Sequence, residues 1–247
     1  MTIMSADETT EQTLPDGPPI VDLVTALRAR YGSPERGAPE PPIDGLVATI
    51  LSQNTSDINT ERSFATLKRR FPDWDAVADA PVVEVADAIR GGGLADRKAP
   101  RIQQVLREIR ERTGGYDLSF LGAMEIGKAR NWLTTLNGVG PKTASCVLMF
   151  NLGRDAMPVD THVHRVALRL YLIPPGTSAE KAHALLEAKL PPGAAHDAHL
   201  LMIRHGRETC TARRPRCAEC VLVQCCPSAP LFLGANGANA NGAGTSR

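Results

Sequence analysis

The sequence predicts an all-α protein, and three observations support that prediction. Apolar residues recur three and four positions apart in most segments, whereas no segment alternates with the two-residue period of a β-strand. Hydrophobic residues make up 43% of the chain, which is enough for a packed core. Aromatic residues make up only 4%, so that core must consist mainly of leucine, valine, isoleucine and alanine. From this periodicity we expect about ten helices.

The expected helices occupy most of the chain beyond residue 19. Proline, serine or aspartate precedes several of them, and Asp44 is expected to cap the second. By residue number they are 20–31, 45–52, 58–70, 82–90, 98–113, 129–136, 141–151, 161–171, 179–190 and 196–207. The polar leader, residues 1–19, and the tail rich in glycine, alanine and asparagine, residues 228–247, are expected to be disordered.

Charge is distributed unevenly along the 247 residues, although the net charge is only +1. The first 44 residues carry eight acidic and three basic side chains, and the remainder carries 19 acidic and 25 basic ones. A modestly basic body of this kind is compatible with binding to DNA. Neither a membrane span nor a secretion signal is expected, because no apolar run approaches roughly 18 residues and the N-terminus is acidic.

One segment rich in glycine and proline, LNGVGPKTASCVL (residues 136–148), predicts two helices joined by a tight hairpin. Gly138 can adopt the positive φ that ends a helix, and Pro141 suits the first position of the next helix. Val139 is expected to fill the corner between the two glycines. The free N–H groups of such a hairpin form a site for phosphate, and Gly138, Val139 and Gly140 would let a nucleic-acid backbone come close.

Lys142 lies in the first turn of the second helix of this hairpin. A lysine that has lost its proton can attack a sugar or carbonyl carbon as a nucleophile. Asp160 follows 18 residues later and directly precedes another predicted helix. Taken alone, Lys142 is an exposed lysine and Asp160 is a helix N-cap. Together they supply a nucleophile and a carboxylate.

The motifs LNGVGPKTA (residues 136–144) and VDTHVHR (residues 159–165) resemble the helix–hairpin–helix DNA glycosylases, and within them the endonuclease III family. The resemblance extends from about residue 20 to about residue 227. It implies two helical domains that flank a DNA-binding cleft: a six-helix bundle with the hairpin at residues 41–154, and an iron–sulfur cluster domain at residues 20–40 and 155–227. It also implies that Lys142 and Asp160 are the catalytic residues.

Five of the six cysteines lie within the last forty residues. Disulfides are disfavoured, because nothing places the chain in an oxidising compartment. From spacing alone, zinc and an iron–sulfur cluster are equally acceptable. The resemblance implies a [4Fe–4S] cluster, held by Cys210, Cys217, Cys220 and Cys226, with Cys225 as a spare thiol.

The resemblance further implies two loops that fill the space left by a flipped nucleotide. In LSQNT (residues 51–55), either Gln53 or Asn54 would enter the base stack, and the sequence does not decide between them. In GLADRKA (residues 93–99), Leu94 would be an apolar wedge. Without the resemblance, Leu94 would be a helix-start anchor.

Arginines surround the first cysteine of the cluster. Arg207, Arg213 and Arg214 are interpreted as contacts to DNA phosphate, since acidic residues are sparse there. The alternative is a solvated charged loop.

The function implied by the resemblance is a bifunctional DNA glycosylase and lyase of base excision repair. It would act as a monomer in the cytoplasm, on duplex DNA that contains oxidised pyrimidines or abasic sites. The adenine-mismatch relatives lack the lysine and have glutamate at the position of Thr49, and thymine-mismatch relatives usually replace the lysine with tyrosine. The alternatives are a mismatch-specific glycosylase and a non-catalytic DNA-binding module whose iron–sulfur cluster senses oxidation.

Overall fold

The computed structural model describes residues 17–238, and the predicted all-α class is confirmed there: the described chain holds twelve α-helices and no strand. Short 3₁₀ turns and one π-helix, labelled η, connect or extend them. The elements are α1 (Ile20–Tyr31), α2 (Pro42–Leu51), α3 (Asp57–Arg70), α4 (Trp74–Asp79), α5 (Val82–Ala88), η1 (Arg90–Gly92), α6 (Ala95–Thr113), η2 (Ser119–Ala123), α7 (Ile126–Thr134), α8 (Pro141–Cys146), η3 (Val147–Asn151), α9 (Thr161–Arg169), α10 (Ala179–Glu187), α11 (Ala195–Glu208), η4 (Cys217–Glu219), η5 (Val223–Cys225) and α12 (Ala229–Ala238).

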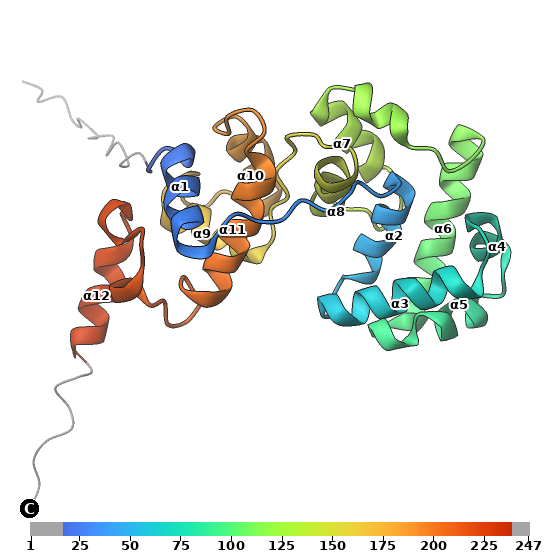
Figure 1. Cartoon of the computed structure of the whole chain (residues 1–247), viewed down its shortest axis with the longest axis horizontal. Helices are drawn as coiled ribbons and strands as arrows, with labels where there is room; N and C mark the ends of the chain where they lie inside the picture. The colour runs from blue at the N-terminus through green and yellow to red at the C-terminus, as the bar shows by residue number, and fades with distance from the viewer. Residues whose placement is uncertain (1–16, 239–247) are drawn as a thin grey trace, which may run out of the picture.

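The buried apolar side chains form two separate clusters. One is drawn from residues 43–156, and the other combines residues 20–27 with residues 157–222. In Figure 1, α2 to α8 lie on one side and α1 lies with α9 to α11 on the other, while the segment after α1 crosses between them. We propose that these two clusters are the cores of two domains.

Several helix ends differ from the predicted ones. The second helix begins at Pro42, so Asp44 lies inside its first turn and does not cap it. Asp44 instead accepts hydrogen bonds from Trp74 Nε1 at 2.9 Å and Lys68 Nζ at 3.1 Å. The short helix α4, which Asp73 caps, was not predicted because six residues are too few to show a helical period.

The prediction of a disordered tail from residue 228 is wrong over the part that the structure describes. Residues Ala229–Ala238 form α12, which packs on η4 and buries Ala229. The ring of Phe232 lies over the Arg169 guanidinium at 4.5 Å. The apolar residues at the start of this segment explain the outcome, because they can cover a surface that the tail's composition alone does not reveal. Residues 1–16 and 239–247 lie outside the described residues.

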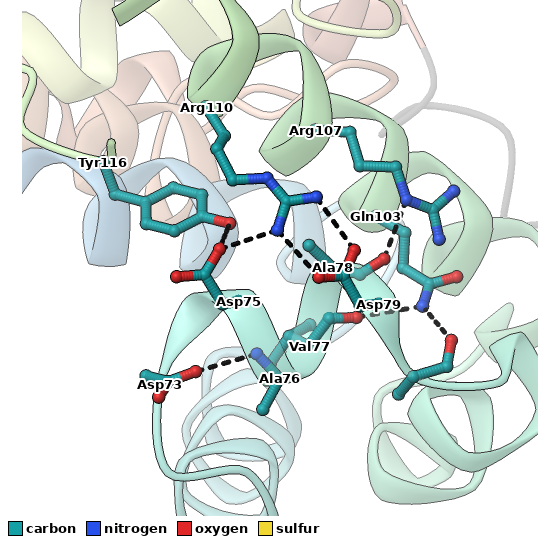
Figure 2. A network of polar contacts seen from close by, with 11 residues as sticks. Asp73, Asp75, Ala76, Val77, Ala78, Asp79, Gln103, Arg107, Arg110 and Tyr116 are labelled. Atoms are coloured by element: carbon teal, nitrogen blue, oxygen red, sulfur yellow. Dashed lines mark hydrogen bonds and ion pairs between the residues drawn. The ribbon is translucent and has the colours of Figure 1, made fainter. Parts of the chain in front are cut away.

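A polar network fixes α4 against the second half of α6 (Figure 2). Arg110 contacts Asp75 at 2.7 Å and Asp79 at 2.8 Å, and Tyr116 donates to Asp75 at 2.9 Å. Hydrogen bonds from Arg110 lower the pKa of both aspartates. Gln103 of α6 also contacts α4, because its Nε2 donates to the carbonyl of Val77 at 2.9 Å.

Candidate active site and DNA-binding face

The predicted hairpin is present between α7 and α8. Gly138 has a φ of +81°, and Gly140 is the N-cap of α8, with Pro141 in the first turn. Val139 is buried at the corner, and its N–H donates to the carbonyl of Leu136. A Cβ at Gly138 would lie 2.5 Å from the side chain of Arg101, so this glycine is needed both for its backbone and for that close approach.

Lys142 follows Pro141 in the first turn of α8 and is half-buried. One turn later, Cys146 is buried, and burial raises the pKa of its thiol. The charge of Lys142 lowers that pKa and the charge of Asp160 raises it, so both side chains lie near the thiol. The chain then forms the π-helix Val147–Asn151, an irregularity that frequently occurs at functional sites.

Asp160 is the N-cap of α9, as its position before residues 161–163 predicted. Its Oδ1 accepts hydrogen bonds from the N–H of His162 at 2.8 Å and of Val163 at 2.7 Å. No side-chain hydrogen bond in the described chain involves Oδ2. Lys142 forms no ion pair with Asp160 or any other carboxylate of the described residues, so neither group neutralises the other.

The segment that leads to Asp160 is held by two buried histidines that sequence reasoning missed. His199 Nδ1 lies 2.9 Å from the carbonyl of Pro158, and His183 Nδ1 lies 2.7 Å from the carbonyl of Met157. A carbonyl only accepts, so each Nδ1 carries the proton. Burial lowers the pKa of each imidazole to about 4, and the charges of Asp160 and Lys142 also act on His199.

His162 and His164, which attract attention in the motif, have local partners instead. His162 Nδ1 faces Arg165 at 3.1 Å, and His164 Nε2 lies 2.7 Å from the carbonyl of Thr177. The histidines that hold the segment before Asp160 are His183 on α10 and His199 on α11. Nothing in their local sequence distinguishes them from other histidines.

A buried ion pair links the helix of Lys142 to the segment of Asp160. Arg130 on α7 pairs with Glu187 on α10, and their side chains are only 12% and 15% exposed. Arg130 Nε also donates to Ser145 of α8 at 2.9 Å, and Glu187 accepts from the N–H of Met157 at 2.7 Å. Ser145, three residues after Lys142, and Met157, three residues before Asp160, therefore belong to the same hydrogen-bond network.

The two predicted loops both contain a residue with left-handed backbone. Asn54 has a φ of 56° and is exposed, whereas the half-buried Gln53 accepts a hydrogen bond from Arg101 at 3.1 Å. Leu94 has a φ of 52° and remains 48% exposed. Positive φ is a genuine outlier for leucine, and such strain clusters at ligand-binding segments.

Four of the five C-terminal cysteines surround one cavity, which they share with Arg169 and His205. Cys225 is exposed and does not line it. Burial raises the pKa values of Cys217, Cys220 and Cys226, and nearby thiols raise them further. The four that line the cavity are Cys210, Cys217, Cys220 and Cys226.

The donor set of this cavity fits an iron–sulfur cluster. Arg169 donates to Cys210 Sγ at 3.3 Å and the N–H of Leu222 donates to Cys220 Sγ at 3.4 Å, and hydrogen bonds to the sulfurs are typical of such clusters. Among the described residues, no group of three or more His, Cys, Asp or Glu side chains, these cysteines included, is arranged to hold a metal ion.

The predicted phosphate contacts lie at the end of α11 and in the loop that follows it. Arg207, Arg213 and Arg214 are all exposed. Arg207 Nη1 lies 4.0 Å from Asp57 Oδ2 at the start of α3, two residues after the first predicted loop. None of the described helices has the length and apolar character needed to cross a bilayer.

Residues 47–192 match the family model of the HhH-GPD superfamily of base excision DNA repair proteins. The chain belongs to this superfamily. Among curated proteins it is 32% identical to endonuclease III of Sulfolobus acidocaldarius over 73% of this chain and 79% of that protein. It is 35% identical to endonuclease III of Synechocystis sp. over 76% of this chain and 82% of that protein.

An Arabidopsis thaliana protein named "Putative DNA glycosylase" is 41% identical over 67% of this chain, which spans 56% of that protein's length. Among solved structures, a DNA-bound endonuclease III trapped as a covalent intermediate matches with a TM-score of 0.72 and 26% identity. That match covers 87% of this chain and 97% of the other. The resemblance read from the two motifs is thereby confirmed, and this protein is an HhH-GPD base excision repair DNA glycosylase.

Proposed function

We propose that this HhH-GPD protein is a bifunctional DNA glycosylase and abasic-site lyase that removes oxidised pyrimidines from duplex DNA. The observation that carries the proposal is the placement of Lys142 and Asp160. They lie at the starts of α8 and α9, and their charges act on the same two buried groups, Cys146 and His199. This common neighbourhood supports a site in which Lys142 is the nucleophile and Asp160 is the carboxylate.

The proposed reaction begins with a nucleotide turned out of the duplex, because a stacked base cannot be reached. The neutral amine of Lys142 attacks C1′ as the bond between C1′ and the base breaks, and the base leaves with a proton. Asp160 stabilises the positive charge that develops at C1′ and helps to deprotonate the amine.

Ring opening of the sugar then gives a Schiff base between Lys142 and C1′. Loss of a C2′ proton breaks the bond between C3′ and its phosphate, which is β-elimination. Water finally hydrolyses the Schiff base and returns the lysine amine.

The DNA contacts of this proposal lie on elements already described. The N–H groups of Gly138 and Gly140 would bind phosphate, and the arginines at the end of α11 and in the loop after it would extend the same path. Leu94 would enter the stack as the wedge. Asn54 is the proposed partner of the orphan base, because it is exposed while Arg101 holds Gln53.

The superfamily membership and the four cysteines that line one cavity support a [4Fe–4S] cluster. Cys210, Cys217, Cys220 and Cys226 would hold it, and it would supply a rigid cross-link, with no part in breaking the glycosidic bond. Arg213 and Arg214 lie between the first two of these cysteines, so the cross-link would fix their loop toward DNA phosphate.

Borohydride trapping on duplex DNA with one thymine glycol tests the proposal. We expect a covalent adduct only on the damaged duplex, its loss in Lys142→Gln, and its retention in Lys128→Gln, which removes an exposed lysine from α7. Asp160→Asn keeps an oxygen for the helix cap but removes the charge, so it should fold normally and trap poorly.

The other outcomes identify the alternatives. Base release without an adduct, on this lesion or on a mismatch, would indicate a monofunctional or mismatch-specific glycosylase. If the protein forms no adduct and releases no base on any oxidised pyrimidine, the remaining alternative is the non-catalytic DNA-binding iron–sulfur module.

A further inference from the structure

Lys98, in the first turns of α6, is a buried lysine with no acidic partner. Its side chain is only 3% exposed, and no carboxylate in the described part of the chain forms an ion pair with it. Burial lowers the pKa of its ammonium. Its Nζ donates instead to two backbone carbonyls, that of Leu51 at 2.6 Å and that of Gly92 at 2.9 Å.

Both carbonyls belong to the last residue of a helix. Leu51 ends α2 and Gly92 ends the 3₁₀ turn η1. The final carbonyls of a helix have no partner within the helix, and they favour a cation. Lys98 therefore satisfies two helix ends that are 41 residues apart in the sequence, which explains how a buried ammonium is tolerated without a carboxylate.

The left-handed residues of the two proposed DNA-facing loops lie within three residues of these carbonyls. Asn54, with a φ of 56°, comes three residues after Leu51, and Leu94, with a φ of 52°, comes two residues after Gly92. Left-handed conformations at such residues persist only where the surroundings fix them. The ammonium of Lys98 is the one side-chain group in the described chain that hydrogen-bonds to the base of both loops.

We propose that Lys98 is a positioning residue that couples the two loops. By holding both loop bases at one point, it sets Asn54 and Leu94 in a fixed relative position, so that they enter the DNA stack together. This inference rests on the proposed function for its DNA step, but the coupling itself is a property of the free protein.

The structure provides a matched control for this coupling. Arg101 lies one turn further along α6 and donates to Gln53 of the first loop at 3.1 Å. Its side chain also packs against Gly138 of the hairpin, and it has no hydrogen bond to the second loop in the described chain. Arg101→Met should therefore release the first loop alone, whereas Lys98→Met should release both.

Hydrogen exchange measured by mass spectrometry on the full protein tests the coupling without any activity. In Lys98→Met we expect at least tenfold faster exchange in peptides covering residues 52–56 and 93–96, with α11 unchanged as an internal reference. In Arg101→Met only the first of these peptides should change. Lys98→Gln offers an amide that reaches one carbonyl, so it should release one loop and serves as the second variant if Lys98→Met does not fold.

Acceleration of only one peptide in Lys98→Met would overturn the coupling. So would unchanged exchange in both peptides.

A second measurement tests the consequence for DNA. Stopped-flow fluorescence of 2-aminopurine placed opposite an abasic-site analogue reports the entry of the loops into the stack. We expect Lys98→Met to slow this signal at least tenfold and Lys98→Arg to restore most of it. Trapping of Lys142 on a single-stranded abasic site, which leaves no hole to fill, should stay within twofold of the wild type.

The two experiments separate the inference from the proposed function. If the wild-type protein traps on no DNA, the proposed function fails, yet the exchange result still decides whether Lys98 couples the loops. An equal loss of the 2-aminopurine signal and of single-stranded trapping in Lys98→Met would mean general damage to the site and would refute the positioning role.

Discussion

The buried pair of Arg130 and Glu187 allows a quantitative prediction. Replacing Glu187 with glutamine removes the charge but keeps an oxygen that can accept from the N–H of Met157. Arg130, whose side chain is only 12% exposed, then retains a charge without its partner. Breaking one side of a buried pair destabilises by about 3–5 kcal/mol, and the remaining exposure of both side chains favours the lower end, about 3 kcal/mol.

Glu187→Ala should be more destabilising, because the N–H of Met157 also loses its acceptor. An unsatisfied buried donor adds about 1–3 kcal/mol. At roughly 2–4 °C per kcal/mol for a chain of this size, Glu187→Gln should lower Tm by about 6–12 °C, and Glu187→Ala should lower it further. Thermal unfolding followed by circular dichroism at pH 7, with matched protein concentration and scan rate, measures both.

The double variant Arg130→Met/Glu187→Leu provides the decisive comparison. Burial raises the pKa of Glu187 even though the N–H of Met157 and the charge of Arg130 lower it, so the pair does not fully offset its own desolvation. An apolar replacement of both residues should then be less destabilising than either single change. A Glu187→Gln variant within about 0.5 kcal/mol of the wild type, or a double variant worse than both singles, would refute this reasoning.

Three further predictions concern the wedge, the buried histidines and the cysteines. Leu94→Ala should slow base excision from duplex DNA more than cleavage at a preformed abasic site, and equal slowing of the two single-turnover rates would exclude a wedge. His183 has a pKa of about 4, below its usual 6.5, so the unfolded chain binds a proton that the native state does not, and stability falls as pH drops from about 6.5 to 4. Denaturant unfolding across that range should show His183→Asn losing about 3 kcal/mol less than the wild type, and parallel curves would contradict the assignment. Cys220→Ser should abolish visible iron–sulfur absorbance in the purified protein while Cys225→Ser retains it, and the reverse result would reassign the ligands.

The helical class and most helix positions were accessible from the sequence because they depend on local patterns. Periodicity located ten of the helices, and glycine and proline located the hairpin. Short helices such as α4 were missed because they lack a measurable period. The start of α6 was placed at residue 98, whereas it lies at Ala95, because the left-handed Leu94 that precedes it has no sequence signature.

The two candidate catalytic residues could be proposed from the sequence for a different reason. Lys142 and Asp160 stand in short segments whose spacing and composition are distinctive. Their supporting residues are not: His183, His199 and Glu187 lie on α10 and α11, in segments that resemble any amphipathic helix. Only the fold brings them to the backbone of Met157 and Pro158, which precede Asp160, so the sequence alone does not reveal them.

The two interpretations of Asp160, a helix cap and a catalytic carboxylate, are therefore not alternatives. The cap occupies Oδ1 with two N–H donors and fixes the side chain, and the histidines and Glu187 fix the backbone that precedes it. Catalysis by a carboxylate requires the same immobility, because a charge stabilises a transition state only if it is already in place. The N-cap position of a helix supplies this immobility, so the carboxylate need not move when charge develops in the transition state. The local contacts of Asp160 are those of a helix cap alone, and its proposed catalytic role depends on Lys142, whose charge acts on the same two buried groups.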